Sequence, residues 1–480
     1  MNTPDLLIVG AGPAGMAAAI TARGNGLETL IIDDQPTPGG QIWRAVEAGA
    51  RNDRILGPSY AEGRAIADAF RSSGADYRQG TQLWQVERGL RALVSRDGKS
   101  YAIEPRAIIL ATGAQERAAP FPGWTLPGVL TVGAAQILLK SAGQIPDGAV
   151  WIAGCGPLPL LYAIQLLEAG GEIAGFLDTT PHGQWRSALR YLPGALLGVR
   201  DLAKGLGWLR KLRRSGTPVI HAVTDIAALG TDSVEALRYR TADGPVTTVG
   251  ATTLLVHEGV VPSIHPALSL GCQLEWEDPQ SCMRPVVDEW GETSVKGIFI
   301  AGDGAGIGGA KAAFLRGQIA GLRVAATLGK VSETDVADAA VPVRRKLRRE
   351  LASRPFLDAM YRPRREIFSP ADDTIICRCE EITAGDVRRA GKVGQPGPNQ
   401  VKAATRAGMG PCQGRQCGYT VMHLLSEVQN RTPSDVGFLN IRPPLRPLTI
   451  GELASLQPAR TSASANSVIS PADEGEECDG

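Results

Sequence analysis

The chain has 480 residues, enough for about three domains of ordinary size, each with its own buried core. Hydrophobic residues make up 43% of it and charged residues 21%, which is typical of a globular protein and excludes a disordered or membrane-spanning chain. The 50 Lys and Arg residues nearly equal the 49 Asp and Glu residues, so overall charge does not attract the chain to nucleic acid or to an anionic membrane.

The N-terminus is polar and leads at once into an apolar strand at residues 6–9, so we expect neither a secretory signal nor a transmembrane segment. The longest charge-free apolar run, residues 149–167, has glycines and prolines near its middle and predicts a strand, a turn and a helix. We expect a cytoplasmic protein, with peripheral association with a membrane as an alternative. Its eight cysteines then meet a reducing environment, which favours metal or redox chemistry over disulfides.

A glycine-rich turn follows the first strand and leads into an alanine-rich helix, and the next strand ends in Asp33. Gly10 permits the tight turn, Gly12 lets the backbone approach a pyrophosphate, and Gly15 lets helix and strand pack closely. Asp33 stands where a carboxylate accepts hydrogen bonds from ribose hydroxyls. Strand, turn, helix and acid together predict a dinucleotide-binding module and not an ordinary turn.

The strand, turn and helix pattern is repeated once, and two other strands also run into small residues. After a helix at residues 59–73 and a hairpin within 76–104, the buried strand at 107–110 ends in small residues, as does the strand at 298–300. Between them a second strand, glycine turn and helix starts at Trp151, and a hairpin around Asp243 and a closing strand at 253–256 follow it.

The second module departs from the pattern, because Pro159 stands where the third glycine is expected after Gly154 and Gly156. Proline lacks an N–H group and adds bulk at the start of the helix, so nucleotide binding at this module stays open. Residues 331–370 form a charged connector, in which a solvated helix face is favoured over a basic patch because acids are interspersed. Residues 459–480 are Ser/Ala-rich and then acidic, and we expect a disordered tail there.

Four cysteines gather late in the chain: Cys377, Cys379, Cys412 and Cys417. Four thiolates brought together need a cation to offset their charge, which indicates a metal site. Structural zinc favours wider gaps than the C-x-C pair formed by the first two cysteines, whereas a two-iron cluster spreads its ligands over two metals. The spacing therefore favours iron–sulfur over zinc, with unliganded thiols as a third alternative.

Residues 377–381 and 405–418 resemble the [2Fe-2S] domain of the bacterioferritin-associated ferredoxin type. With the motifs at 10–15, 38–44 and 111–117 and the Ala-Gly-Asp-Gly run at 301–304, the chain resembles the alpha (A) subunit of heteromeric flavin-dependent amino-acid dehydrogenases: opine oxidase, D-hydroxyproline dehydrogenase and hydrogen cyanide synthase. The N-terminal part is also similar to the alpha subunit of heterotetrameric sarcosine oxidase.

The resemblance implies an α/β fold with two dinucleotide-binding domains, like glutathione reductase, followed by a small [2Fe-2S] domain. The expected domains are a discontinuous FAD-binding domain (1–119 and 255–330), an inserted second domain (120–254), the connector (331–370), the [2Fe-2S] domain (371–440) and a C-terminal extension with its tail (441–480). Carried over by motif, the residues expected to bind FAD are Gly10, Gly12, Pro13, Ala14, Gly15, Asp33, Gly40, Gln41, Thr112, Gly113, Gly302 and Asp303. A helix cap is the alternative for Asp303.

The resemblance further implies an electron-transfer subunit that carries FAD and a [2Fe-2S] cluster, while a partner beta subunit with its own FAD oxidises the amine or amino acid. An additional small subunit and an FMN at a subunit interface stay open, and nucleic acid is not expected as a partner. No catalytic base or nucleophile stands out: Cys155, Cys272 and Cys282 form no C-x-x-C pair, which disfavours a disulfide reductase, and the five histidines form no ligand-spaced set. The alternatives are a self-sufficient NAD(P)H-dependent flavin reductase and a non-catalytic ferredoxin-like carrier.

Overall fold

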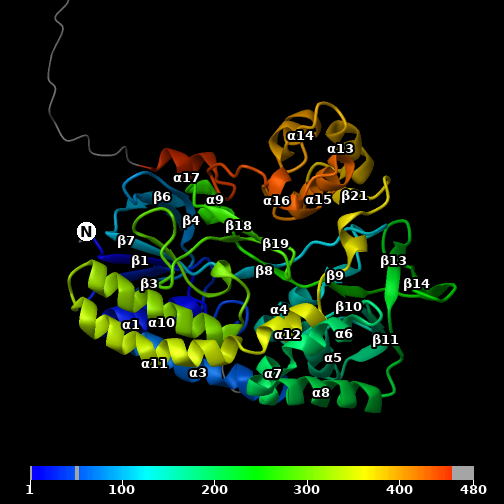
Figure 1. The fold of residues 1–480 in the computed structure, drawn as a ribbon, viewed down its shortest axis with the longest axis horizontal. Coiled ribbons are helices and arrows are strands. Elements are labelled where there is room, and N and C mark those ends of the chain that lie inside the picture. The colour runs from blue at the N-terminus through cyan, green and yellow to red at the C-terminus, as the bar shows by residue number, and fades with distance from the viewer. Residues whose placement is uncertain (1–2, 49–52, 457–480) are drawn as a thin grey trace, which may run out of the picture.

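Two parallel five-stranded sheets organise most of the chain, and a small helical domain lies beside them (Figure 1). The architecture is that of a computed structural model, which describes residues 3–48 and 53–456. Figure 1 shows the first sheet with its helices at the left, the second sheet at the lower right and the helical domain, with α13, α14 and α15, at the upper right. The expected class, two dinucleotide-binding modules followed by a small C-terminal domain, is confirmed.

The first sheet has the strand order β20-β7-β1-β2-β3. Its central strands are four-residue runs of buried aliphatic residues, as expected for parallel strands covered on both faces. Its strands are β1 (Leu6–Val9), β2 (Thr29–Ile32), β3 (Asp76–Arg78), β7 (Ala107–Leu110) and β20 (Ile298–Ile300). Helices α1 (Pro13–Gly24) and α10 (Ala310–Thr327) pack closely, because a Cβ at Gly317 would lie 2.1 Å from the carbonyl oxygen of Ala14.

Smaller elements complete this first module. They are helices α2 (Asp53–Leu56) and α3 (Pro58–Ser72) and the antiparallel strands β4 (Gln82–Val86), β5 (Ala92–Arg96) and β6 (Lys99–Ile103). The expected helix at 59–73 and the hairpin within 76–104 are both confirmed.

The second sheet has the order β12-β11-β10-β16-β9 and belongs to the inserted module. Its strands are β9 (Val129–Thr131), β10 (Ala149–Gly154), β11 (Glu172–Asp178), β12 (Val219–Ile220) and β16 (Leu254–His257). Helices α4 (Val132–Ala142), α5 (Pro157–Glu168) and α8 (Val199–Arg214) accompany it, as does the antiparallel meander β13 (Val223–Leu229), β14 (Ala236–Thr241) and β15 (Val246–Gly250). Because β16 ends at His257, the second sheet runs past residue 255, where we expected the first module to resume.

Two crossing strands join the modules. β8 (Ala114–Glu116) leaves the first module and pairs antiparallel with β17 (Val260–Pro262), which returns to it. After β17 come α9 (His265–Ser269) and the hairpin of β18 (Leu274–Glu277) and β19 (Cys282–Pro285). The C-terminal domain rests on this hairpin, since Cys282 and Met283 share a hydrophobic core with Val421 and Leu425.

The connector forms α11 (Glu333–Leu351), α12 (Arg354–Met360) and a short 3-10 turn, η6 (Arg365–Phe368). Most of the basic residues of α11 are exposed, as expected of a solvated face, except Arg344, whose guanidinium lies 4.1 Å from the ring centroid of Trp290. The second half of the connector does not fit that expectation, because Arg364 is buried against the second module.

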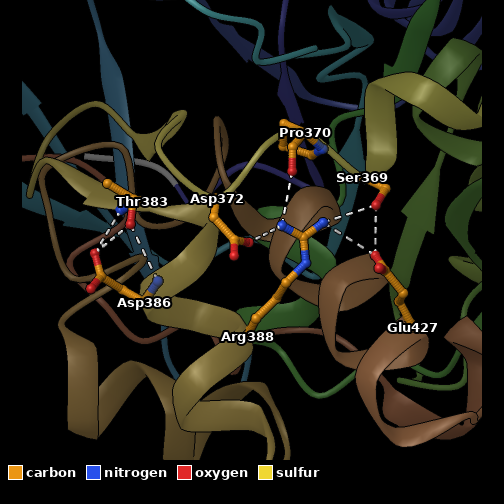
Figure 2. Close-up of polar contacts among 7 residues, drawn as sticks. All are labelled: Ser369, Pro370, Asp372, Thr383, Asp386, Arg388 and Glu427. Carbon is orange, nitrogen blue, oxygen red and sulfur yellow. Dashed lines mark hydrogen bonds and ion pairs between the residues drawn. The ribbon is translucent and has the colours of Figure 1, made fainter.

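The C-terminal domain contains β21 (Ile375–Cys377), β22 (Ile382–Thr383), α13 (Ala384–Gly391), α14 (Pro398–Thr405), α15 (Gly418–Gln429) and α16 (Pro433–Val436). Figure 2 shows how Arg388 of α13 holds the end of the connector: its guanidinium donates to the Pro370 carbonyl and Ser369 Oγ, each at 2.9 Å, and contacts Asp372 and Glu427. Beside it, Thr383 and Asp386 form a capping box that starts α13.

The chain then returns to the first module. Leu445 N donates to the Trp84 carbonyl at 2.7 Å, and Ser455, just after α17 (Ile450–Ala454), accepts at Oγ from Ser100 N at 2.7 Å. The beginning of the expected C-terminal extension is therefore packed on the β4-β5-β6 sheet. The tail expected from residue 459 lies outside the described residues.

Candidate functional site

A cavity of about 420 Å³ opens at the carboxyl ends of the strands of the first sheet. In open α/β sheets this edge is where ligands bind. Eleven of the twelve residues expected to bind FAD line it: Gly10, Gly12, Pro13, Ala14, Asp33, Gly40, Gln41, Thr112, Gly113, Gly302 and Asp303. The twelfth, Gly15, lies behind the turn.

The glycine turn after β1 is held by close backbone contacts. Gly10 has φ +104°, and a Cβ there would lie 2.5 Å from the Ala111 carbonyl oxygen; a Cβ at Gly15 would lie 1.8 Å from the Gly10 carbonyl oxygen. No side chain caps the start of α1 at Gly12. The first N–H groups of α1 therefore stay available to an anionic group in the cavity, which the helix dipole also favours.

Asp33 is buried at the cavity wall and is already hydrogen-bonded to the backbone. Its Oδ2 accepts from Ala11 N at 2.5 Å and its Oδ1 from Gln35 N at 2.8 Å. Burial raises the pKa of Asp33 to about 6, and the nearby Asp34 carboxylate adds to the rise, while the two backbone N–H groups oppose it. Asp33 thus fastens the glycine turn to the end of β2, and its oxygens keep acceptor capacity for a ribose hydroxyl.

Asp303 holds the loop that precedes α10, and it is not the helix cap considered as an alternative, because no side chain caps the start of α10. Its Oδ1 accepts from Gly308 N at 2.9 Å and from Gly309 N at 3.0 Å, which ties the loop after β20 to the start of α10. The residue also lines the cavity. The backbone contacts and the position in the cavity wall are compatible, because they leave the second carboxylate oxygen for another donor.

Three hydrogen-bonded polar side chains, which the sequence analysis did not single out, support the Gly40–Gln41 turn. Lys140 Nζ donates to the Gln41 carbonyl at 3.1 Å and to Gln136 Oε1 at 2.8 Å, and Gln136 Nε2 donates to Gln165 Oε1 at 2.8 Å. Burial lowers the pKa of Lys140 to about 7, with a smaller contribution from the Arg44 guanidinium. The apolar stretch around Lys140 contains no signal for this role.

The four clustered cysteines come together as two pairs. The Cys417 thiol hydrogen-bonds to Cys377, and Cys379 hydrogen-bonds to Cys412. The bond from Cys417 lowers the pKa of Cys377 to about 6, and backbone N–H groups of Gly408, Glu380 and Cys379 stabilise its thiolate further.

The paired thiols are compatible with a two-metal cluster. In the described part of the chain, no group of three or more His, Cys, Asp or Glu side chains converges on one metal position. Zinc needs all four ligands around one point, whereas each iron of a [2Fe-2S] cluster takes two thiolates. Gly410 lets the second pair approach, because a Cβ there would lie 2.1 Å from Cys379 Cβ.

The cysteine loop forms part of the wall of the cavity. Arg415, between Cys412 and Cys417, lines the cavity and donates from Nη1 to the Cys412 carbonyl at 3.1 Å. Its own carbonyl accepts from Gln115 Nε2 at 3.0 Å. His265 lies 3.1 Å, at Nε2, from the Gln413 carbonyl, and burial lowers the pKa of this histidine to about 3, so it is neutral. The cysteine loop of the C-terminal domain thus meets β8 and α9 between the cavity and the thiols.

Family comparisons agree with this geometry. Residues 4–327 match the model described as pyridine nucleotide-disulphide oxidoreductase, and residues 375–427 match the BFD-like [2Fe-2S] binding domain. The chain belongs to the pyridine nucleotide-disulphide oxidoreductase family. The two matches establish FAD and a [2Fe-2S] cluster as its cofactors.

Relatives of this family member match over nearly their whole length. The A subunit of opine oxidase from Agrobacterium tumefaciens (strain Ach5) is 44% identical over 94% of this chain and 92% of that protein. The HcnB subunit of hydrogen cyanide synthase from Pseudomonas protegens is 33% identical over 92% of this chain and 96% of that protein. Among solved structures, L-proline dehydrogenase from P. horikoshii has a TM-score of 0.70 at 20% identity, covering 94% of this chain and 79% of that chain, and supports the fold. The resemblance stated from the motifs is confirmed.

This member of the family lacks a cysteine pair of the disulfide-reductase kind among its described residues, whose seven cysteines are all free. Burial raises the pKa of Cys282 to about 11 and also raises that of Cys155, so neither is a reactive thiolate. The histidines have structural surroundings: His257 Nδ1 lies 2.7 Å from Glu116 Oε1, and His423 stacks on Phe368 with centroids 3.9 Å apart.

The nucleotide edge of the second module is covered by the connector. The Arg364 guanidinium forms a buried ion pair with Glu258, 2.9 Å from Nη2 to Oε1, and also contacts the Thr224 carbonyl. Burial raises the pKa of Tyr361 to about 12, and the negative charge of nearby Asp178 at the end of β11 contributes. A cavity of about 660 Å³ remains on the meander side of this edge, with Arg364 and Glu258 in its wall.

Proposed function

We propose that this chain is the electron-transfer subunit of a heteromeric dehydrogenase or oxidase that acts on a C–N bond of an opine, hydroxyproline or a similar secondary amine or amino acid. The similar proteins, named as the A subunit of opine oxidase and the HcnB subunit of hydrogen cyanide synthase, support a flavin and [2Fe-2S] subunit of such an enzyme. Substrate oxidation takes place on a partner beta subunit with its own FAD. A further small subunit and an FMN at a subunit interface stay open within this proposal.

The observation that carries the proposal is the shared wall between the cavity and the cysteine loop. Arg415 belongs to both, and Gln115 joins the strand that leaves the first module to the Arg415 carbonyl. When bound, the flavin and the cluster supply electron acceptance and one-electron transfer, and the chain supplies their position and electrostatic surroundings. A loop common to both sites keeps the two cofactors close in this proposal.

Each expected residue has a place in this proposal. The first turn of α1 holds the FAD pyrophosphate, Asp33 the adenosine ribose, and the Gly40–Gln41 turn and the Thr112–Gly113 strand end close the cavity. Asp303 bonds the ribityl chain, and Gly15 acts by packing and not by contact. The proposed cluster ligands are Cys377, Cys379, Cys412 and Cys417, whose four-thiolate ligation leaves no open position for a substrate.

An assay of the purified chain tests whether substrate oxidation takes place on the partner subunit. Without a partner we expect no amine-dependent turnover of opines, prolines or glycine, because the chain has no amine-oxidising site of its own in this proposal. Addition of the co-purifying partner is expected to give turnover. Robust turnover by the chain alone would contradict the proposal.

The cluster assignment has its own test. Replacing Cys412→Ser is expected to abolish the visible absorption of the cluster and the paramagnetic signal of its reduced state, while the flavin stays bound. Cys272→Ser is the matched control. Cys272 is a free buried cysteine that hydrogen-bonds to Thr293 and is not one of the four proposed cluster ligands. Stoichiometric zinc without iron in the wild-type protein would refute the assignment.

Anaerobic mixing with NADH or NADPH separates the alternatives. We expect little flavin bleaching, because Pro159 alters the second phosphate turn and Arg364 covers the same edge. Rapid bleaching would favour a self-sufficient reductase, and a chain isolated without flavin would favour the ferredoxin-like carrier.

We infer a cytoplasmic location from the free thiols of the described cysteines, which fit a reducing compartment. Searched over its described residues, the structure contains no helix with the length and apolarity needed to cross a bilayer. Peripheral association with a membrane stays a part of the proposal.

A further inference from the structure

Residues 184–214, the basic segment, carry a local excess of positive charge. The segment contains eight Lys or Arg residues and one acidic residue, whereas the whole chain has 50 of the former and 49 of the latter. It consists of α6 (Gln184–Ala188), α7 (Leu192–Ala195), α8 and the short 3-10 turns η3 (Leu189–Tyr191) and η4 (Leu196–Gly198). A charge balance taken over the whole chain hides this local excess.

The basic segment also exposes large apolar side chains. Of the sixteen exposed large hydrophobic residues among the described residues, seven lie in it: Trp185, Leu189, Leu192, Leu196, Leu197, Val199 and Leu206. Leu197 is 71% exposed and Leu206 68%. Singly scattered apolar residues on a surface need no explanation, but seven exposed within one segment favour an interaction site.

Helix α8 sorts its residues into two faces. Trp208, Leu209 and Leu212 pack toward the hydrophobic core, and α8 contacts α5. The helical repeat places Val199 and Leu206 on the opposite, exposed face. The outward face is therefore apolar in its first half and not a continuation of the core.

The second half of that outward face is basic. The helical repeat puts Arg210, Arg213 and Arg214 in line with Leu206, and all three are exposed. Within the described part of the chain, none of the three has an acidic partner. Their charge is thus unneutralised and available to an external anion.

The exposed residues are presented by a well-supported scaffold. A Cβ at Gly194 would lie 2.7 Å from the Ala352 carbonyl oxygen, and a Cβ at Gly198 would lie 2.9 Å from Ser353. Gln184 Nε2 donates to the Ala359 carbonyl at 2.7 Å. The turn that carries Leu196 and Leu197 is thereby packed against the start of α12, while both leucines stay exposed.

We propose that the basic segment docks the protein on an anionic membrane surface. Leucines and a tryptophan that enter the interface, bordered by arginines that meet lipid headgroups, are the composition of an interfacial amphipathic helix. The guanidinium of Arg186 lies 5.7 Å from the ring centroid of Trp185, and the guanidinium of Arg190 lies 4.8 Å from the ring centroid of Tyr191. Each aromatic ring therefore makes a cation–π contact with the neighbouring arginine. An array of anionic headgroups complements this charge density better than a protein surface of ordinary mixed charge.

The place of the segment in the molecule suits this docking. Figure 1 shows α7 and α8 along the lower edge of the molecule and the [2Fe-2S] domain, with α13 and α14, at the opposite edge. A bilayer at the lower edge leaves the cluster domain free for a partner. The proposal does not depend on the electron-transfer function, because no residue of the basic segment lines the flavin cavity.

Vesicle co-sedimentation of the full chain with its cofactors bound tests the proposal. We expect binding to phosphatidylcholine vesicles that contain about one third phosphatidylglycerol, weak binding to pure phosphatidylcholine, and release by salt. Arg210→Gln/Arg213→Gln is expected to weaken binding about 25-fold, from about fivefold for each cation near the surface. Leu196→Ser/Leu197→Ser is expected to weaken it at least about tenfold through lost apolar burial.

Matched variants on α11 serve as controls. Arg345→Gln/Arg348→Gln removes the same charge from another exposed basic face, and Val341→Ser removes another exposed apolar residue, 61% exposed. Both are expected to bind vesicles within about twofold of wild type. Flavin and cluster absorption report that every variant is folded.

Several outcomes would overturn the proposal. Absence of binding to the anionic vesicles would do so. An equal loss of vesicle binding in Arg345→Gln/Arg348→Gln would also do so, because it would show that only the net charge of the protein matters. If the leucine variant instead releases the partner subunit or breaks up a self-associated form on gel filtration, the surface belongs to a protein interface.

Discussion

The two dinucleotide modules of this chain share one sequence pattern but differ in what surrounds the ends of their strands. In both, the first glycine of the turn lies against the neighbouring strand: a Cβ at Gly10 would lie 2.5 Å from the Ala111 carbonyl oxygen, and one at Gly154 would lie 2.1 Å from that of His257. The first module then opens into a cavity lined by its turn. At the second, the connector lies over the strand ends and pairs Arg364 with Glu258.

The comparison shows that two modules can share one fold while their strand ends have different surroundings. The strand order, the glycine turn and the helix are kept in the second module, so its part in the core is intact. What has changed is Pro159 in the first turn of α5 and a segment from outside the module that covers its edge. Nucleotide chemistry resides in the turn and its access, whereas the sheet mainly contributes stability.

The largest expected effect comes from placing a methyl group at the turn of the first module. In Gly15→Ala the new Cβ would meet the Gly10 carbonyl oxygen at 1.8 Å, so α1 must move away from the turn. We expect complete loss of bound flavin after gel filtration and a loss of at least about 3 kcal/mol in the free energy of unfolding. Visible absorbance and denaturant titration measure the two effects.

The matched substitution in the second module sharpens the contrast. Pro159→Ala changes the corresponding position, and we expect full flavin content with a stability change of about 1 kcal/mol. If this variant also released the flavin, the two modules would not be separable in function, and the comparison would fail.

A loss of stability without loss of flavin is expected where the connector covers the strand ends of the second module. Arg364→Met leaves the buried carboxylate of Glu258 without its partner, and one of its oxygens, Oε2, already lacks a hydrogen bond within the described residues. Loss of one member of a buried pair costs about 3–5 kcal/mol, which a denaturant titration detects. We expect the flavin to remain bound, since Arg364 does not line the first cavity.

Two further variants distinguish loss of the buried Arg364–Glu258 pair from the general effect of removing a charge. Arg364→Met/Glu258→Gln removes both charges and is expected to recover most of the stability. Arg362→Met breaks an exposed pair with Asp278 and is expected to cost less than about 1 kcal/mol. Equal losses in the free energy of unfolding for Arg362→Met and Arg364→Met would show that the Arg364–Glu258 pair makes no specific contribution.

Much of the first module could be predicted from the sequence, because its signals are local. A tight turn that needs Gly10 and Gly15, and strand ends that carry Asp33 and Asp303, are visible as short motifs. The cysteines were predicted for the same reason, since their chemistry requires four thiolates. How the thiols pair depends on the path of the loop around Gly410, which spacing does not reveal.

The residues that were missed are single charges whose partners are distant in sequence. Arg364 lies in a stretch that reads as solvated connector, and its partner is 106 residues away. Lys140 lies on an apolar helix and meets the Gln41 carbonyl 99 residues away. Periodicity describes the face of a helix but not what packs on it, so such contacts become visible only in the tertiary structure.

The smallest effect expected is a pH dependence that originates at Lys140. Its pKa is about 7 in the folded protein against an ordinary value of 10.5, so between these values the unfolded chain binds a proton that the folded one does not. Stability therefore rises with pH across this window, by up to about 1.4 kcal/mol per pH unit, and the contribution is lost as the pH falls toward 7. Lys140→Gln should flatten the rise between pH 7 and 9, whereas Lys311→Gln, which removes an exposed lysine of α10, should keep it. Equal slopes in both variants would mean that the Gln41 turn is not supported by a titrating lysine, and that burial alone holds this wall of the cavity.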